Sequence, residues 1–123
     1  MKLMISGSRT ATTQTDIEKL TAELERLKPA ELLTGGAKGA DQIAENWAKQ
    51  KGIPTTTLKP DYARYRKAAT HIRNDELIKQ ADAVLCYYAG TTKTPGTASV
   101  AMKARKQNKL KAEIFRNESA SLL

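Results

Sequence analysis

Short apolar runs that end at glycine or proline alternate with helical patterns along this chain. The runs cover residues 2–6, 30–34, 54–58 and 83–88, and the last of them is the most apolar. Apolar runs of this length, bounded by turn residues, are typical of buried strands. Strands that alternate with helices pair in parallel through right-handed crossovers. The sequence therefore predicts an α/β fold, a single three-layer Rossmann-like domain with a mainly parallel sheet of about five strands.

The first two connecting segments have the spacing of amphipathic helices. Thr15 and Glu18 match a capping box, which places the start of the first helix there, and Pro29 closes it. A second helix is expected to start near residues 38–40 and to end at Gly52, a residue type typical of helix C-termini. Its buried face would carry Ile43, Ala44, Trp47 and Ala48.

The second half of the chain continues this alternation. Residues 62–80 are mostly helical, with an expected interruption around Thr70. Thr97 is expected to cap a last helix that runs through Arg105. Residues 110–114 alternate between apolar and charged side chains, which is typical of a half-exposed edge strand. We assign residues 1–116 to one nucleotide-binding domain and residues 117–123 to a frayed tail.

The strand-end turns contain six of the seven glycines. In a parallel α/β sheet these turns meet at the carboxyl edge, where ligands bind at the point at which the strand order reverses. We therefore expect one pocket at this edge. The residues that we expect to contact a ligand there are Gly7, Ser8, Arg9, Gly35, Gly36, Ala37, Lys38, Gly39, Asp41, Asp61, Arg73, Asn74, Gly90, Gly96 and Thr97.

The segment from Gly35 to Asp41, Gly-Gly-Ala-Lys-Gly-Ala-Asp, is the strongest signal in the sequence. Glycines between a strand and a helix let backbone N–H groups and the helix dipole face an anion, and Lys38 adds a positive charge. The simpler interpretation is a tight turn that needs glycine for its backbone angles. Asp41 has two interpretations of equal weight: complementing the helix dipole, or bonding to a ribose hydroxyl or to the neighbouring loop.

Other polar residues are expected near this segment. Gly7-Ser8-Arg9 offers a hydroxyl and a guanidinium, and an adjacent Arg73-Asn74 can reach a phosphate and a base edge. Gly96-Thr97 can present a second helix N-terminus to the same ligand. His71, the only histidine, has no metal-ligand spacing around it, so we predict neither a metal nor a cofactor.

Charge and composition limit the partners. The net charge is +8, but the cations are scattered and only residues 103–111 form a cluster. We see no interleaving of aromatic residues with these cations, so nucleic acid is a weaker expectation than a small anion. The longest apolar run is far shorter than the ~20 residues of a membrane span, so no membrane partner is expected. A single cysteine, Cys86, fits a reducing compartment, and we expect a cytoplasmic protein.

Several of these residues also resemble a known group of proteins. Gly7-Ser8-Arg9, the segment from Leu33 to Asp41, Pro60-Asp61-Tyr62, Ala68-Ala69, Ile72-Arg73-Asn74 and the segment from Ala81 to Val84 are similar, in order and spacing, to the small single-domain branch of the SLOG superfamily. The resemblance covers residues 1–114. It implies a Rossmann-like sheet with a pocket for nucleotides or nucleotide-derived signals, a homo-oligomer, and a role in bacterial or phage defence signalling.

The resemblance also raises the question of catalysis. LOG phosphoribohydrolases of this superfamily carry a Gly-Gly-x-Gly-Thr-x-x-Glu segment, and here Val100 stands where the glutamate would be. Valine can neither move a proton nor stabilise an oxocarbenium ion. We therefore expect a binding protein, a sensor or sponge without a catalytic residue. The alternatives are a phosphoribohydrolase or N-glycosidase that acts on nucleoside monophosphates through Asp41 or Asp61, and a protein that binds single-stranded DNA.

Overall fold

The computed structural model describes residues 1–117. The strands are β1 (Lys2–Gly7), β2 (Glu31–Thr34), β3 (Thr55–Thr57), β4 (Ala83–Tyr88) and β5 (Leu110–Phe115). The helices are α1 (Gln14–Leu27), α2 (Ala40–Lys51), α3 (Tyr62–Tyr65), the 3₁₀ helix η1 (Arg66–Ala68), α4 (Ala69–Gln80) and α5 (Pro95–Lys106). None of these helices, within residues 1–117, is long and apolar enough to cross a membrane.

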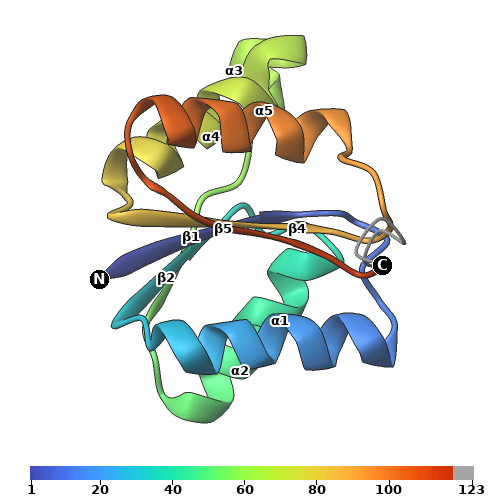
Figure 1. Cartoon of the computed structure of the whole chain (residues 1–123). Helices are drawn as coiled ribbons and strands as arrows, with labels where there is room; N and C mark the ends of the chain where they lie inside the picture. The colour runs from blue at the N-terminus through green and yellow to red at the C-terminus, as the bar shows by residue number, and fades with distance from the viewer. Residues whose placement is uncertain (118–123) are drawn as a thin grey trace.

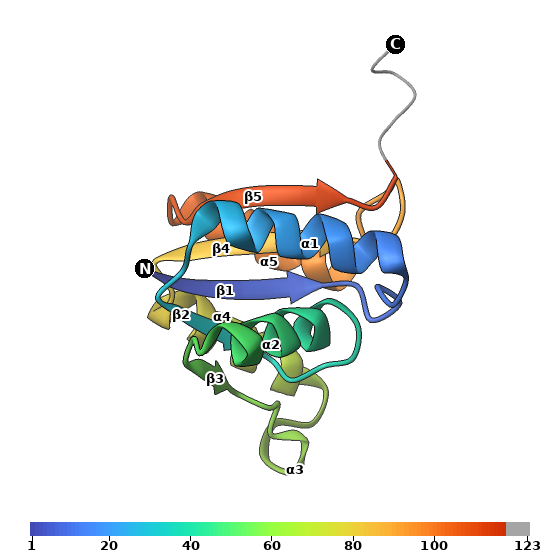
Figure 2. The ribbon, with the colours of Figure 1, turned by 90° about the horizontal axis from the view of Figure 1, so that it is seen from below.

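The sheet is parallel throughout and has the order β3-β2-β1-β4-β5. Figure 1 shows α1 and α2 on one face of the sheet and α4 and α5 on the other. Figure 2, seen from the side of α1 and α2, shows β3 and β5 at the two edges. The prediction of a three-layer Rossmann-like domain is confirmed. The chain leaves β1 and β4 toward opposite faces, so the strand order reverses between these two neighbours.

A separate apolar layer lies between each face of the sheet and the helices that pack on it. On one face, Leu3 and Leu85 pack with Leu20 of α1 and Trp47 of α2. On the other, Met4, Val84 and Cys86 pack with residues of α4 and α5. Alternation of side chains along β1 and β4 produces this division, because successive residues of a strand point to opposite faces.

Three predicted boundaries were wrong. The N-cap of α1 is Thr13, whose hydroxyl accepts a hydrogen bond from the Asp16 N–H at 3.2 Å, whereas the sequence suggested Thr15. The N-cap of α5 is Thr94 and not Thr97, since Pro95 takes the first helical position, where its missing N–H costs nothing. The interruption of residues 62–80 falls at Arg66, whose φ of 49° ends α3, and not at Thr70.

Asp16 explains why α1 begins earlier than the sequence suggested. Its carboxylate is fully buried and accepts hydrogen bonds from the Tyr87 hydroxyl at 2.6 Å and from two nitrogens of Arg116 at 2.8 and 2.7 Å. It also accepts the Thr13 N–H at 3.0 Å, which completes the capping box. Burial by itself would raise the pKa of Asp16, but the bonds from Arg116, Tyr87 and Thr13 hold that pKa well below its usual range. This network connects the end of β5 to the start of α1.

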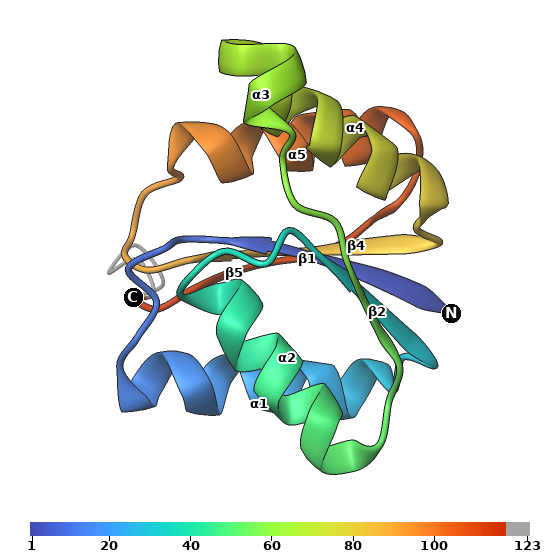
Figure 3. The same ribbon diagram turned by 180° about the vertical axis from the view of Figure 1, so that it is seen from behind.

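Residues 62–68, comprising α3 and η1, form a projection that we call the arm. The arm lies on the outer side of the α4–α5 layer, away from the sheet (Figures 1 and 3). None of its residues is buried. Burial of side chains in the core therefore does not explain the position of the arm.

Candidate functional site

A cavity of about 380 Å³ opens where the strand order reverses, between the end of β1, the helix α4 and the start of α5. We call it the switch-point cavity. Its walls include Gly7, Ser8, Arg9, Gly35, Ala37, Asp41, Arg73, Asn74, Gly96 and Thr97, all of which were predicted from the sequence. Strand-end turns that are far apart in the chain thus meet at one place, as the sheet topology requires.

The floor of the cavity contains residues that sequence reasoning missed. Met4 and Leu77 supply an apolar base, and Ser6, Thr70 and Thr94 add hydroxyl groups around it. Ser6 could have been found, because alternation along β1 places it on the same face as Met4, toward α4 and α5. Thr70 and Thr94 carry no comparable signal, since only the packing of α4 and α5 brings them to the cavity.

The glycine-rich turn is organised by Asp41. Its Oδ2 accepts the N–H groups of Gly35 at 3.1 Å and of Ala37 at 3.2 Å, so these two amides are not available to a phosphate. Of the two interpretations of Asp41, the bond to the neighbouring loop is the one observed. Asp41 is 6% exposed, and burial raises its pKa to about 6 against the effect of these hydrogen bonds and of Arg73.

Arg73 closes the other side of the turn. Its Nη1 donates to the Gly35 carbonyl at 2.9 Å, and its Nε donates to the Asn74 side-chain oxygen at 2.7 Å. A Cβ at position 35 would overlap the guanidinium, so a larger residue there would require Arg73 to move. Nη2 of Arg73 and Nδ2 of Asn74 make no hydrogen bond within residues 1–117. These two donors therefore remain for a ligand.

The start of α5 supplies further donors. The first N–H groups of a helix have no intrahelical acceptor, and no side chain caps this one. Gly96 and Thr97 line the cavity at this point, and no acidic residue occurs in the first turn. The positive end of the helix dipole thus faces the cavity, as was expected of Gly96-Thr97.

A second hollow of about 400 Å³, the outer basin, adjoins the switch-point cavity and shares Arg9, Gly35, Ala37 and Arg73 with it. Gly36, Lys38 and Lys59 line the basin and not the switch-point cavity. Arg9, Lys38 and Lys59 form no ion pair with a carboxylate in the described part of the chain. Asp41 is the only acidic residue in the two linings, so the combined site favours an anion.

Gly7, Ser8 and Gly39 build the wall between β1 and α2. The Ser8 hydroxyl accepts the Ala89 N–H at 3.0 Å, and the Ser8 carbonyl accepts the Ala40 N–H at 3.2 Å. Gly39 has a φ of 81°, and a Cβ there would overlap the Ser8 carbonyl. Ser8 therefore reaches the cavity with one lone pair of its hydroxyl engaged by Ala89, while its O–H can still donate to a ligand.

Of the predicted residues, Gly39, described above, Asp61 and Gly90 line neither hollow. Asp61 caps α3 by accepting the Arg64 N–H at 3.1 Å, and it lines a separate groove of about 490 Å³ behind α4. Gly90 lines neither hollow, and its carbonyl accepts the Asn117 N–H at 3.3 Å. Both follow a strand end, but the chain leads them away from the point at which the strand order reverses.

The remaining reactive side chains do not contribute a nucleophile or a metal site. Cys86 is fully buried in β4, and burial raises the pKa of its thiol to about 12, which makes it unreactive. Trp47 is buried in the core, as predicted. Within residues 1–117, no three histidine, cysteine or acidic side chains lie close enough together to hold a metal ion.

A parallel sheet with a glycine-lined cavity at its point of reversal defines a Rossmann-like α/β protein. Among such proteins, the chain belongs to the YspA, cpYpsA-related SLOG family, YAcAr, whose profile matches residues 1–65. The chain is also similar to the Gene 61 protein of Mycobacterium phage D29, with 33% identity over 114 residues that cover 85% of this chain and 89% of the phage protein. The resemblance inferred from the motifs is thus confirmed, and it supports a nucleotide-related function at the level of the family.

Proposed function

We propose that this protein binds a phosphate-bearing nucleotide or nucleotide-derived signal in the switch-point cavity, as a sensor or sponge. The observation that carries the proposal is the convergence of unpaired donors on one cavity. These donors are Nη2 of Arg73, Nδ2 of Asn74 and the uncapped amides at the start of α5. An apolar floor below such donors is typical of small-molecule sites.

Different residues of the site bind different parts of the ligand. The start of α5 and Arg73 hold phosphate oxygens, because a helix N-terminus and a guanidinium both favour an anion. Asn74 and Ser6 contact the sugar or the base. Arg9 and Lys38 add positive charge at the entrance, where the outer basin opens.

A single observation favours an enzyme as the second candidate. Asp41 is a buried carboxyl at the cavity with a pKa raised to about 6, which suits general acid or base chemistry near neutral pH. It could serve an N-glycosidase acting on nucleoside monophosphates. Val100 lies in the apolar core at 1% exposure, so the position of the LOG glutamate does not open into the cavity. Asp61 is not available either, because it caps α3.

A thermal-shift screen against mono-, di- and cyclic nucleotides and ADP-ribose compounds tests the proposal, with mass spectrometry of each mixture afterwards. We expect at least one compound to raise the Tm by roughly a few degrees and to be recovered intact. Recovery of a free base would establish the enzyme instead. Arg9→Ala and Lys38→Ala should reduce the shift, whereas Lys49→Ala, in the last turn of α2 and outside both linings, should not. Unchanged shifts in the first two variants would overturn the site.

Three further expectations stand beside this proposal. We expect a homo-oligomer, a cytoplasmic location and a role in phage defence signalling, all of which rest on the resemblance and on composition. Size-exclusion chromatography with light scattering measures the first of these directly.

A further inference from the structure

The arm has an unusual composition. Residues 62–68 contain Arg64, Arg66 and Lys67 together with Tyr62 and Tyr65, and no acidic residue. The expectation that aromatic residues are not interleaved with cations holds for residues 103–111 but not for this segment. Alternation of aromatic rings and cations is typical of surfaces that bind single-stranded nucleic acid.

These side chains have no partner in the core. Tyr62 is 55% exposed, and the Arg64 guanidinium lies over the Tyr65 ring at 5.1 Å from its centroid. Arg64, Arg66 and Lys67 form no ion pair with a carboxylate within residues 1–117. An exposed ring and a guanidinium stacked on another ring are both surfaces onto which a base can stack.

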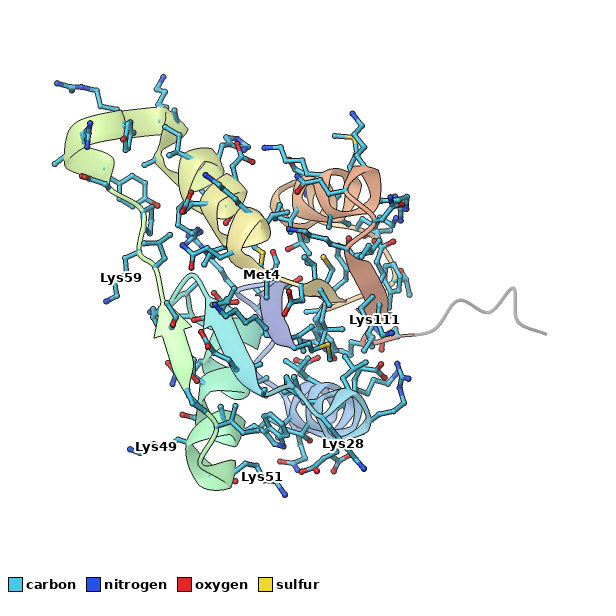
Figure 4. All side chains as sticks on the ribbon, turned by 90° about the vertical axis from the view of Figure 1, so that its left-hand side faces the viewer. Met4, Lys28, Lys49, Lys51, Lys59 and Lys111 are labelled. Atoms are coloured by element: carbon cyan, nitrogen blue, oxygen red, sulfur yellow. The ribbon has the colours of Figure 1, made fainter. Side chains whose placement is uncertain are left out.

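The arm adjoins the proposed ligand site. The Tyr62 hydroxyl lies 3.3 Å from the Thr70 hydroxyl, which lines the switch-point cavity, and Arg9 is close enough to contribute to lowering the pKa of Tyr62. Lys59, two residues before Asp61, lines the outer basin together with Lys38. In Figure 4 the arm, in pale yellow-green, and Lys59 lie on the same side of the molecule, opposite Lys111. Cations thus continue from the cavity through the basin to the arm.

We propose that the arm and the outer basin bind a short single-stranded oligonucleotide whose terminal nucleotide occupies the switch-point cavity. Phosphates that follow the terminal nucleotide lie against Lys38, Lys59 and the arm, and bases stack on Tyr62 and on the Arg64–Tyr65 pair. This inference rests on the proposed function for its terminal nucleotide only.

The distribution of charge argues for this occupant. A second copy of the chain would bring two basic arms together in a protein of net charge +8, and repulsion opposes that. The groove behind α4 carries three carboxylates, Asp61, Asp75 and Glu76, beside three cations, whereas the outer basin carries four cations and no carboxylate. The strand is therefore assigned to the outer basin.

Fluorescence anisotropy with labelled oligothymidylates of one to eight nucleotides tests the proposal. We expect affinity to rise at least about tenfold from the mononucleotide to the tetranucleotide, through added stacking and phosphate contacts. Salt should weaken the longer ligands more steeply, by a slope of about 0.7 per phosphate contacted. A circular oligothymidylate, which has no end to place in the cavity, should bind at least about tenfold more weakly than the linear form.

Matched double variants separate the arm from general charge. Arg64→Gln/Lys67→Gln should abolish the gain with length and leave mononucleotide binding unchanged. Lys49→Gln/Lys111→Gln removes the same charge at sites distant from the arm (Figure 4) and should retain the gain.

The outcomes distinguish this inference from the proposed function. Mononucleotide binding with no gain in affinity with length overturns the inference and leaves the proposed function standing. Equal binding of circular and linear forms overturns the placement of the terminal nucleotide. A loss of binding in Lys49→Gln/Lys111→Gln as large as in the arm variant would show that only net charge matters, and would also overturn it.

Discussion

Asp41 illustrates how one residue can both build a site and influence its ligand. Its carboxylate accepts hydrogen bonds from the Gly35 and Ala37 N–H groups. The glycine-rich turn, which resembles a phosphate-binding loop, is therefore fixed by a side chain of the protein itself. An anion in the cavity must therefore be met by Arg73, Asn74 and the start of α5. The negative charge of Asp41 opposes such a ligand, and protonation near pH 6 relieves that opposition.

The raised pKa of Asp41 predicts a pH dependence of stability. In the unfolded chain this carboxyl ionises with the ordinary aspartate pKa of 3.8, whereas burial in the folded protein raises that pKa to about 6. The folded state thus holds the proton more tightly, and stability falls as pH rises from about 4 to about 6, by about 3 kcal/mol at most. Asp41→Asn keeps an oxygen for the two amides and should lose this dependence. Urea unfolding of both proteins at pH 4 to 7 measures this pH dependence of stability. The same dependence in both proteins would contradict its assignment to Asp41.

At the scale of the element, the start of α1 is a place where the structure differs from the prediction made from the sequence. Thr13→Ala removes the hydroxyl that accepts the Asp16 N–H and should cost about 1 kcal/mol of unfolding free energy. Thr15→Ala is the matched control, because Thr15 lies exposed in the first turn and should change stability by less than about 0.5 kcal/mol. Chemical denaturation of the two variants compares them directly. A larger loss of unfolding free energy in Thr15→Ala than in Thr13→Ala would favour Thr15 as the N-cap.

The arm contains a strained residue between α3 and η1. Arg66 has φ 49° and ψ −121°, a conformation that costs a non-glycine residue about 1–3 kcal/mol. Arg66→Gly should therefore stabilise the protein by about 1 kcal/mol after the greater chain entropy of glycine is deducted. Arg66→Ala removes the same charge and should give no gain. Differential scanning calorimetry distinguishes the two, and equal Tm values would argue that residue 66 is not strained.

At the scale of the whole molecule, Arg116 closes the fold by connecting the end of β5 to Asp16 and to the Thr10 carbonyl. A chain that ends after residue 117 keeps Arg116 and serves as the control. A chain that ends after residue 115 leaves the Asp16 carboxylate buried without its cation and should lose about 3 kcal/mol.

The loss of stability at low pH provides a second test of the contact between Asp16 and Arg116. Because the folded pKa of Asp16 is lowered, its contribution is present above pH 4 and is lost as pH falls below that value. The chain that ends after residue 115 should lack this acid sensitivity. Thermal unfolding between pH 2 and pH 7 compares the two lengths, and similar profiles would contradict the role of Arg116.

Much of this protein could be predicted from its sequence because the determining interactions are local or periodic. Apolar runs that stop at glycine identify the strands, and parallel topology then requires that their carboxyl ends meet. Strand ends and topology place Arg9, Asp41 and Thr97 at one edge of the sheet, and these residues line the same cavity, whereas Arg73 reaches that cavity from within α4.

Only the tertiary structure decided which of the candidate groups are free to bind. Asp41 takes two amides of the glycine-rich turn, and the burial of Asp16 beside Arg116 moves the start of α1. Asp61 follows a strand end but caps α3 outside the cavity. The burial of Asp16 depends on Arg116, which lies 100 residues away in the chain, whereas Asp41 and Asp61 bond to nearby backbone amides whose positions depend on the folded turns. Spacing along the chain determines where a strand or helix can form, whereas the assignment of each donor and acceptor depends on the packed whole.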